Sequence, residues 1–392
     1  MFFCLKGENF NGNDFAQAAL EHGAACVVTE RADLAGTDGF FVVDNVLETL
    51  QQLSLYHRRQ LTIPVIGITG TNGKTTTKEL VAAVLSQKYK TAFTKGNLNN
   101  HIGVPLTLLS IKPDDEIAIV EMGANHNGEI AQLCKFVEPD FGLITNIGKA
   151  HIEGFGSVEN IVNTKRAVYD AVMSRGGELF VNAADTRLTE LVKGYGKINF
   201  YGGDSEIKGE VVEMNPYLKV KIFGQTVQSH LTGNYNINNM LAAVAVGKRF
   251  SVPNDLIMKA LEEYIPSNNR SQINKIGTNT VIADFYNANP TSMTAALENL
   301  AAIVSEKKLA ILGEMRELGA DSGDEHRKIV ELTERLGIPA LFVGNEFCRC
   351  GGATAFETVA ALNEHLAANM PQSTLILIKG SRGVHLENVK IE

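Results

Sequence analysis

Short apolar segments alternate with amphipathic segments along most of this 392-residue chain. The runs EIAIVEMGA, FGLITNIG and ELFVNAAD are apolar enough to be buried strands, and sequence with helical spacing of its apolar positions separates them. Such alternation is typical of a mainly parallel sheet that is covered by helices on both faces. The pattern therefore predicts an α/β protein.

The alternation divides into three regions. Residues 1–63 predict a small α/β unit with strands in FFCLKG, AACVVTE and GFFVVD, and residues 64–266 predict the parallel-sheet domain. Residues 267–392 predict a Rossmann-like domain with strands in NTVIADFY, KLAILGE, ALFVG and TLILIKG. Because Met1 is followed at once by strand-like residues, we expect a preceding strand to be missing from the first unit.

Composition narrows the class of protein. The chain has no run of 18 apolar residues and no secretory leader pattern, so a cytoplasmic protein is expected. Five cysteines without CxxC spacing favour reduced thiols over disulfides or a zinc site. A net charge of −8 without a basic stripe argues against a nucleic-acid partner.

The stretch PVIGITGTNGKTT, residues 64–76, is the strongest chemical signal. A short apolar run precedes a glycine-rich turn, and helix-type sequence follows, which predicts a strand, a phosphate-binding loop and a helix N-terminus. Lys74 can then reach phosphates, and Thr75 can hold Mg²⁺. The general motif expects its first glycine at position 68, where this chain has Ile68.

Two strand ends carry polar side chains. Glu121 closes an otherwise apolar strand, where a carboxylate is costly to bury unless it is paired or bound to a metal. His151 and Glu153 follow the strand FGLITNIG in a glycine-rich turn. Because the carboxyl ends of parallel strands meet at one edge of the sheet, these groups are candidate partners of the phosphate loop.

Lys165 lies within the apolar stripe of a helix that Ser157 can cap. Its stem could pack while its ammonium reaches water. Alternatively, burial beside Arg166 would lower the pKa of the lysine, so that it could react with CO₂ and bind Mg²⁺ as a carbamate. The periodicity alone leaves both interpretations open.

Two asparagine-containing runs remain. Asn236 and Asn239 lie three residues apart at a helix start and could bind an adenine edge. In DFYNANP, Asp284 ends a strand and Asn289 can cap the next helix, so Asp284 is expected to point into an interdomain cleft. Ordinary capping and turn chemistry is the alternative for both runs.

Taken together, the motifs resemble the Mur ligase family, the ATP-dependent enzymes that form amide bonds in peptidoglycan assembly. The resemblance is carried by GTNGKTTTKE, GNLNNHIGVPLTLL, EMGANHNGEIAQL, TNIGKAHIEGFGS, DFYNANPTSMTAAL, LGEMRELG and LIKGSRGVHLE, which span nearly the whole chain. DFYNANPTSMTAAL and LGEMRELG are most similar to the branch of the family that adds D-alanyl-D-alanine.

The resemblance implies three domains, with a truncated UDP-binding α/β unit at residues 1–63, a central ATP-binding domain at 64–266 and a Rossmann-like domain at 267–392. It also implies a role for each matching residue. Catalytic roles fall to Lys74, Lys165, His151 and Arg270. Nucleotide contacts fall to Gly70, Thr71, Asn72, Gly73, Lys74, Thr75, Thr76, Asn236, Asn239, Arg270 and Asp284. Metal contacts fall to Thr75, Glu121, His151 and a carbamylated Lys165, and substrate contacts to Asn97, Asn99, Asn100, His101, Lys379, Ser381 and Arg382.

The implied reaction is ATP-dependent addition of D-alanyl-D-alanine to a UDP-N-acetylmuramoyl-tripeptide, by a monomer that uses two Mg²⁺ ions. The third residue of the peptide stays open between diaminopimelate and lysine. Arg166 and Ala167 follow Lys165 where relatives usually have Gly-Glu or Ser-Glu, so a role for that glutamate is absent. The alternatives are a sister ligase, of the folylpolyglutamate or diaminopimelate-adding type, and an ATP-binding switch or scaffold protein that ligates nothing.

Overall fold

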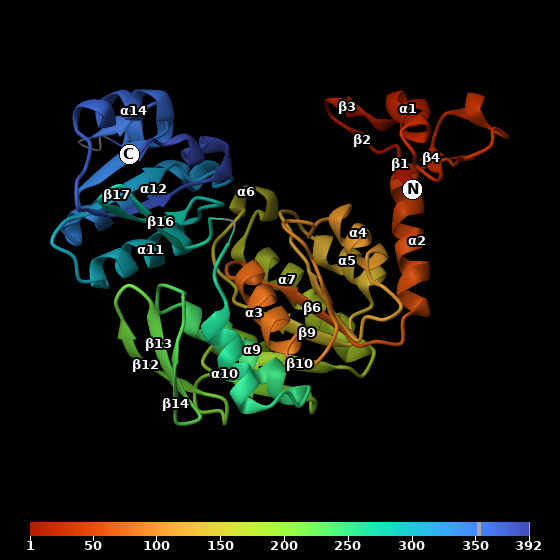
Figure 1. The fold of residues 1–392 in the computed structure, drawn as a ribbon, viewed down its shortest axis with the longest axis horizontal. Coiled ribbons are helices and arrows are strands. Elements are labelled where there is room, and N and C mark those ends of the chain that lie inside the picture. Colours follow the sequence, from red (N-terminus) through yellow and green to blue (C-terminus); the bar gives the residue numbers. More distant parts are fainter. Residues whose placement is uncertain (268, 351–353, 392) are drawn as a thin grey trace.

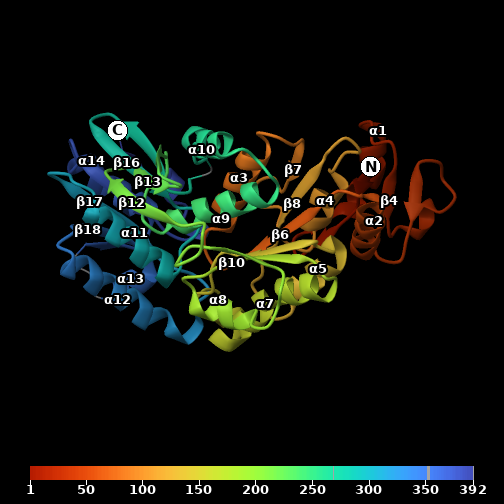
Figure 2. The ribbon, with the colours of Figure 1, turned by 90° about the horizontal axis from the view of Figure 1, so that it is seen from below.

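The computed structural model describes residues 1–267, 269–350 and 354–391. It contains three units that follow one another along the chain, and the predicted α/β class is confirmed (Figure 1). The first unit and the last unit lie on opposite sides of the central one, which makes the molecule elongated (Figures 1 and 2).

The first unit is a small three-stranded parallel sheet in the order β1-β4-β5, with a short β2–β3 hairpin beside it. The predicted strand FFCLKG is in fact split, because the chain turns after β1 into the hairpin. The elements are β1 (Phe2–Phe3), β2 (Lys6–Gly7), β3 (Phe10–Asn11), η1 (Gly12–Phe15), α1 (Ala16–Glu21), β4 (Val27–Thr29), η2 (Ala32–Leu34), β5 (Phe40–Val42) and α2 (Val46–Gln60).

Helix α2 joins this unit to the central one, where it packs against α4 and α5. Near its end, the buried Arg58 donates to the carbonyl of Val137 at 2.8 Å and to the carboxylate of Asp140 at 2.8 Å. The same Asp140 oxygen accepts from the backbone of Val65 at 2.9 Å, at the start of strand β6. The connection is therefore anchored directly to the strand that leads into the phosphate loop.

The central unit is a six-stranded, fully parallel sheet in the order β11-β10-β9-β6-β8-β7. A three-stranded antiparallel sheet, β12-β13-β14, is attached to it. The strands are β6 (Val65–Thr69), β7 (Thr91–Phe93), β8 (Ile117–Glu121), β9 (Phe141–Ile144), β10 (Glu178–Asn182), β11 (Ile198–Tyr201), β12 (Gly209–Met214), β13 (Leu218–Ile222) and β14 (Gln225–Gln228).

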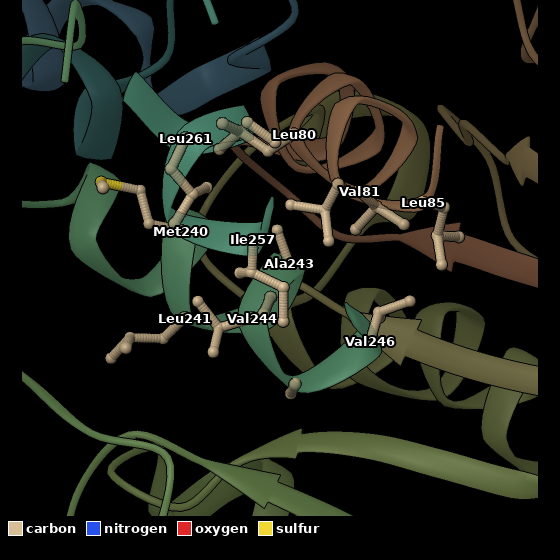
Figure 3. Close-up of a cluster of buried hydrophobic side chains, with 14 of the residues drawn as sticks. Leu80, Val81, Leu85, Met240, Leu241, Ala243, Val244, Val246, Ile257 and Leu261 are labelled. Carbon is tan, nitrogen blue, oxygen red and sulfur yellow. The ribbon is translucent and has the colours of Figure 1, made fainter. Parts of the chain in front are cut away.

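Two hydrophobic clusters cover the two faces of this sheet. On one face, α3 packs against α9 and α10, with Leu80, Met240 and Ile257 among the buried side chains (Figure 3). On the other face, α4, α5, α7 and α8 pack against alternate residues of the same strands. The helices are α3 (Lys74–Leu85), α4 (Gly103–Leu109), α5 (Glu129–Val137), α6 (Ile152–Phe155), α7 (Val158–Ser174), α8 (Thr186–Leu191), α9 (Asn236–Arg249) and α10 (Asn254–Glu263).

The last unit is a six-stranded sheet in the order β15-β16-β20-β17-β18-β19, parallel except for the antiparallel β15–β16 pair. Strand β15 was not predicted from the sequence. The elements are β15 (Gln272–Ile276), β16 (Asn279–Asp284), α11 (Pro290–Ala302), β17 (Lys308–Gly313), η3 (Gly319–Asp321), α12 (Ser322–Arg335), β18 (Ala340–Val343), α13 (Asn345–Arg349), β19 (Ala355–Phe356), α14 (Val359–Ala368), β20 (Leu375–Lys379), η4 (Arg382–Val384) and η5 (Leu386–Asn388).

Candidate active site

The candidate site lies where the order of the central strands reverses. Strand β6 has β8 on one side and β9 on the other, so the loops that follow all three strands meet at one edge. In open α/β sheets, ligands bind at this point, outside the carboxyl ends of the strands. Residues 70–73 follow β6 and form the glycine-rich loop at this edge.

Two loop positions require glycine. Gly70 has φ of 150°, and a Cβ there would lie 1.9 Å from the hydroxyl of Thr145. Gly73 has φ of 77° and begins helix α3 without a side-chain cap. Because no side chain takes the first-turn N–H groups, they are available to an anion, and the helix dipole favours negative charge at this end.

The segment after β9 braces the loop. Thr71 donates its N–H to the carbonyl of Asn146 at 2.9 Å, and Asn72 donates its N–H to the side-chain oxygen of Asn146 at 3.1 Å. Thr145 donates in turn to the carbonyl of Asn72 at 2.6 Å. Thr145 and Asn146 were not predicted as site residues, although their position at the end of the strand FGLITNIG places them at the same edge of the sheet as the loop.

Two lysines share one acceptor behind this loop. Lys74 donates to the carbonyl of Gly70 at 2.8 Å, and Lys165 donates to the same oxygen at 3.0 Å. Burial lowers the pKa of Lys74 to about 8; the charge of Arg270 acts in the same direction, whereas Glu121 opposes it. Burial also lowers the pKa of Lys165 well below its usual value, and the charge of Lys74 adds to this effect.

This arrangement removes one of the two interpretations of Lys165, in which the ammonium reaches water, and leaves the carbamate as a prediction. Its side chain is only 3% exposed, so it does not reach out to water. The prediction that Arg166 lowers its pKa is wrong, because Arg166 points away on the exposed helix face and pairs with Asp170 at 3.1 Å. The cation that acts on Lys165 comes instead from the phosphate loop, through tertiary packing.

Glu121 ends β8 and is fully buried. Its Oε1 accepts from the Thr75 hydroxyl at 3.1 Å and from the Asn99 amide at 2.8 Å. Its Oε2 is buried and has no hydrogen-bond partner among the described residues. Since Mg²⁺ prefers oxygen ligands, a carboxylate with one unpartnered oxygen beside the hydroxyl of Thr75 fits such an ion.

His151 lies at the start of α6 with φ of 52°, and its Nδ1 contacts the carboxylate of Glu317 from the last unit. Glu317 itself has φ of 64° and was not singled out by the sequence analysis. Within the described part of the chain, no three His, Cys, Asp or Glu side chains gather as a metal site. A cation at Glu121 would therefore need ligands beyond such side chains.

Asn236 and Asn239 lie at the start of α9 and are mostly buried. Asn239 donates to the side-chain oxygen of Asn236 at 2.8 Å, and its own oxygen accepts from the hydroxyl of Thr77 at 3.0 Å. Asn236 donates to the carbonyl of Thr232 at 2.7 Å. Part of their hydrogen-bonding capacity is thus used to fix this helix against α3.

The last unit supplies the opposite wall. Asp284, at the end of β16, accepts from Lys379, at the end of the neighbouring strand β20, at 2.7 Å. Arg270 lies over the ring of Tyr286, 3.9 Å from its centroid, and Arg382 approaches the same ring at 6.0 Å. Among the described residues, neither of these two arginines forms an ion pair with a carboxylate. They are therefore available to an anion in the cavity.

Direct hydrogen bonds join the two walls. Asn289 caps α11, as predicted, and also donates to the side-chain oxygen of Asn72 in the phosphate loop at 2.8 Å. Asn299 of α11 donates to the hydroxyl of Thr232 at 2.9 Å. The motif DFYNANP therefore connects the last unit to the phosphate loop itself.

Between the walls lies a cavity of about 870 Å³. Nearly all the site residues predicted from sequence line it: Thr71, Asn72, Gly73, Lys74, Thr75, Thr76, Asn97, Asn99, Asn100, His101, Glu121, His151, Asn236, Asn239, Arg270, Asp284, Lys379, Ser381 and Arg382. Lys165 lies behind the loop, and neither it nor Gly70 of the loop is part of the lining. The side-chain oxygen of Asn100 is partly used within its own loop, since it accepts from the N–H groups of Ile102 at 3.1 Å and Gly103 at 2.8 Å.

The three units match known families in order. Residues 1–70 match the Mur ligase family catalytic domain, residues 68–247 the Mur ligase middle domain, and residues 269–382 the Mur ligase glutamate ligase domain. The UDP-N-acetylmuramoyl-tripeptide–D-alanyl-D-alanine ligase of Synechocystis is 35% identical over 98% of this chain and 87% of that protein. This chain belongs to the Mur ligase family.

Solved structures of the Mur ligase family agree. MurF from Acinetobacter baumannii has a TM-score of 0.88 and 32% identity over 98% of this chain and 88% of that one. MurF from Thermotoga maritima, in complex with ADP, has a TM-score of 0.86 and 27% identity over 98% and 92%. Among the described residues, no helix has the length and apolar character needed to cross a membrane.

Proposed function

We propose that this protein uses ATP to join D-alanyl-D-alanine to a UDP-N-acetylmuramoyl-tripeptide in the synthesis of peptidoglycan precursors. A relative and a solved structure whose names state a D-alanyl-D-alanine-adding ligase match almost the whole chain. The observation that carries the proposal is the shared cavity, in which a phosphate loop faces a second wall of cationic and amide side chains. A cavity of this kind can bring a nucleotide and two further substrates together.

The phosphate loop holds the triphosphate of ATP. The phosphates would be bound by the uncapped N–H groups at the start of α3 and by the ammonium of Lys74. Arg270 approaches the same cavity from the other domain. Asn236 and Asn239, with Asp284, contact the nucleoside. The ADP complex of the Thermotoga relative supports nucleotide binding by this fold.

Mg²⁺ would be held by Thr75 and Glu121, with His151 and Lys165 at a second ion, and would offset the repulsion between ATP and the carboxylate it phosphorylates. The unpartnered Oε2 of Glu121 supports the first position. The low pKa of Lys165 supports a neutral amine that can add CO₂, and this carbamate would supply the oxygens that the amine lacks. Phosphate oxygens of the nucleotide would supply further ligands.

The tripeptide binds along Asn97, Asn99, Asn100 and His101, with its terminal carboxylate toward the phosphates. Phosphoryl transfer to that carboxylate gives an acyl phosphate and ADP. The free amine of D-alanyl-D-alanine then attacks the acyl carbon, and phosphate leaves as the amide forms. The residues of this chain act by orienting the reactants and by stabilising the developing charge.

The dipeptide binds against the last unit, near Lys379, Ser381 and Arg382. Lys379 forms an ion pair with Asp284. Its ammonium therefore holds the end of β16 in place, and we do not assign it to the dipeptide. Arg382 is exposed in the cavity and is the residue we assign to the carboxylate of the dipeptide. The hydrogen bonds between Asn289 and Asn72 complete the site when the domains meet.

The experiment is a phosphate-release assay with ATP and UDP-N-acetylmuramoyl-tripeptides that end in diaminopimelate or lysine. Release should require both the tripeptide and D-alanyl-D-alanine, and the preferred tripeptide identifies the third residue. Turnover with glutamate or diaminopimelate as the acceptor amine would instead indicate a sister ligase. ATP binding without turnover under any combination would indicate a switch or scaffold protein.

A further inference from the structure

Lys78 is a charged side chain to which the proposed mechanism gives no role. It lies on α3, one turn beyond Lys74, and its side chain is 0% exposed. A lysine is almost never fully buried unless its charge is compensated. The surroundings of this ammonium should therefore show what it does.

The ammonium reaches the end of the sheet beside the candidate cation site. Its Nζ donates to the carbonyl of Thr94 at 2.8 Å, and the hydroxyl of Thr94 accepts from the N–H of Glu121 at 3.0 Å. The Nζ lies 4.0 Å from Oε2 of Glu121, the same oxygen that has no hydrogen-bond partner among the described residues. This separation is close enough for strong attraction but too long for a hydrogen bond.

Glu79 is the other carboxylate near Lys78, at 3.7 Å. It is less dependent on the lysine, because it accepts from the hydroxyl of Tyr264 at 2.6 Å and keeps 15% of its side chain exposed. Oε2 of Glu121, by contrast, is buried and accepts no hydrogen bond from any described residue. The counter-charge of Lys78 therefore matters most to Glu121.

We propose that Lys78 is a positioning residue that balances the charge of Glu121 and, by giving its hydrogen bond to Thr94, leaves Oε2 of Glu121 without a hydrogen bond. The buried carboxylate of Glu121 then has a compensating charge nearby and keeps one oxygen free of hydrogen bonds for a divalent cation. The same positive charge weakens cation binding, so that the ion is held only once nucleotide phosphates add their negative charge. This inference rests on the proposed cation role of Glu121.

The test compares Lys78→Met, Glu121→Gln and the double variant of the full chain, with Lys95→Met as the control. Lys95 is a matched control because its exposed ammonium lies over the ring of Phe93, 3.4 Å from the centroid, while that of Lys78 lies 5.7 Å from the same ring. Thermal unfolding is measured in EDTA without nucleotide. Binding of Mn²⁺ in the presence of ADP is measured by the electron paramagnetic resonance signal of the free ion.

In EDTA, Lys78→Met should unfold at a lower temperature than the parent, because a buried carboxylate loses its counter-charge. Adding Glu121→Gln should recover about 3 °C or more of that loss. In the ADP complex, Lys78→Met should bind Mn²⁺ about tenfold more tightly than the parent. Lys95→Met should change neither quantity.

Two results would overturn the proposal. If the double variant is no more stable than Lys78→Met, or also fails to fold where Lys78→Met fails, Lys78 supports the fold independently of Glu121. If Lys78→Met binds Mn²⁺ no more tightly than the parent, its charge does not control the cation. Failure of the proposed cation role is seen separately, as unchanged Mn²⁺ binding in Glu121→Gln.

Discussion

Affinity for ADP should fall above about pH 8, because the ammonium of Lys74 binds the phosphates and burial has lowered its pKa to about 8. In the free protein, a pKa of about 8 leaves roughly nine-tenths of Lys74 protonated at pH 7 and roughly one-tenth at pH 9. Phosphates next to Lys74 keep it protonated in the complex. The ratio of dissociation constants at pH 9 and pH 7 should therefore be about 10, or about 1.4 kcal/mol.

The assay is calorimetric titration with ADP between pH 7 and 9.5, in buffers of different ionisation enthalpy. Near pH 9 the complex should take up close to one proton, and Lys74→Met should bind weakly with no such uptake. The free energy of unfolding should change with pH in the opposite direction to ADP affinity. Because the pKa of Lys74 is lowered in the folded state, this lysine destabilises that state below pH 8, and the penalty disappears between pH 8 and 10.5. Affinity that is independent of pH in the parent, or equally pH-dependent in Lys74→Met, would show that protonation of Lys74 does not control ADP binding.

Three further substitutions test the rest of the site. Lys165→Ala should lower turnover by at least about 100-fold, and formate or acetate should restore part of the activity by replacing the carbamate oxygens. Activity that survives without the additive would show that the side chain of Lys165 only packs. Arg382→Met should raise the KM for D-alanyl-D-alanine by about 10–100-fold and remove discrimination against D-alanyl-D-alaninamide, whereas retained discrimination would place the dipeptide carboxylate elsewhere. Gly70→Ala should abolish ADP binding, because its Cβ would lie 1.9 Å from the side chain of Thr145. The control Gly323→Ala should bind ADP normally, because a Cβ there meets nothing within 4 Å. Equal binding by the two variants would contradict the loop geometry.

The parts of the fold that local patterns specify were predictable. The alternation of buried strands and amphipathic helices predicted the central parallel sheet, and glycines followed by Lys74 predicted the loop after β6. Strand ends carrying Glu121 and His151 were expected at one edge, because parallel strands point the same way. The structure brings both side chains into the cavity.

Side-chain partners across domains were not predictable from one sequence. Arg166 seemed to be the neighbour of Lys165 because it is adjacent in the chain, yet helix geometry turns adjacent residues to different faces. The link from Asn289 to Asn72 joins residues 217 positions apart. Strand β15 was missed because Gln272–Ile276 alternates weakly and pairs only at an edge of the sheet.

Lys78 shows the same limit. A lysine one turn after Lys74 resembles an ordinary surface residue, and only the packing of α3 against the sheet buries it. The domain boundaries, the monomeric state and the residue roles stay predictions. Each of the substitutions above examines one of those roles separately.

The central claim is that ATP phosphorylates the tripeptide carboxylate before the amide forms. The most direct measurement uses UDP-N-acetylmuramoyl-tripeptide with ¹⁸O in its terminal carboxylate, together with ATP and D-alanyl-D-alanine, and analyses the products by mass spectrometry. Acyl phosphate formation predicts one ¹⁸O atom in the released phosphate for each pentapeptide formed. Phosphate without ¹⁸O, or ADP formed without pentapeptide, would contradict it.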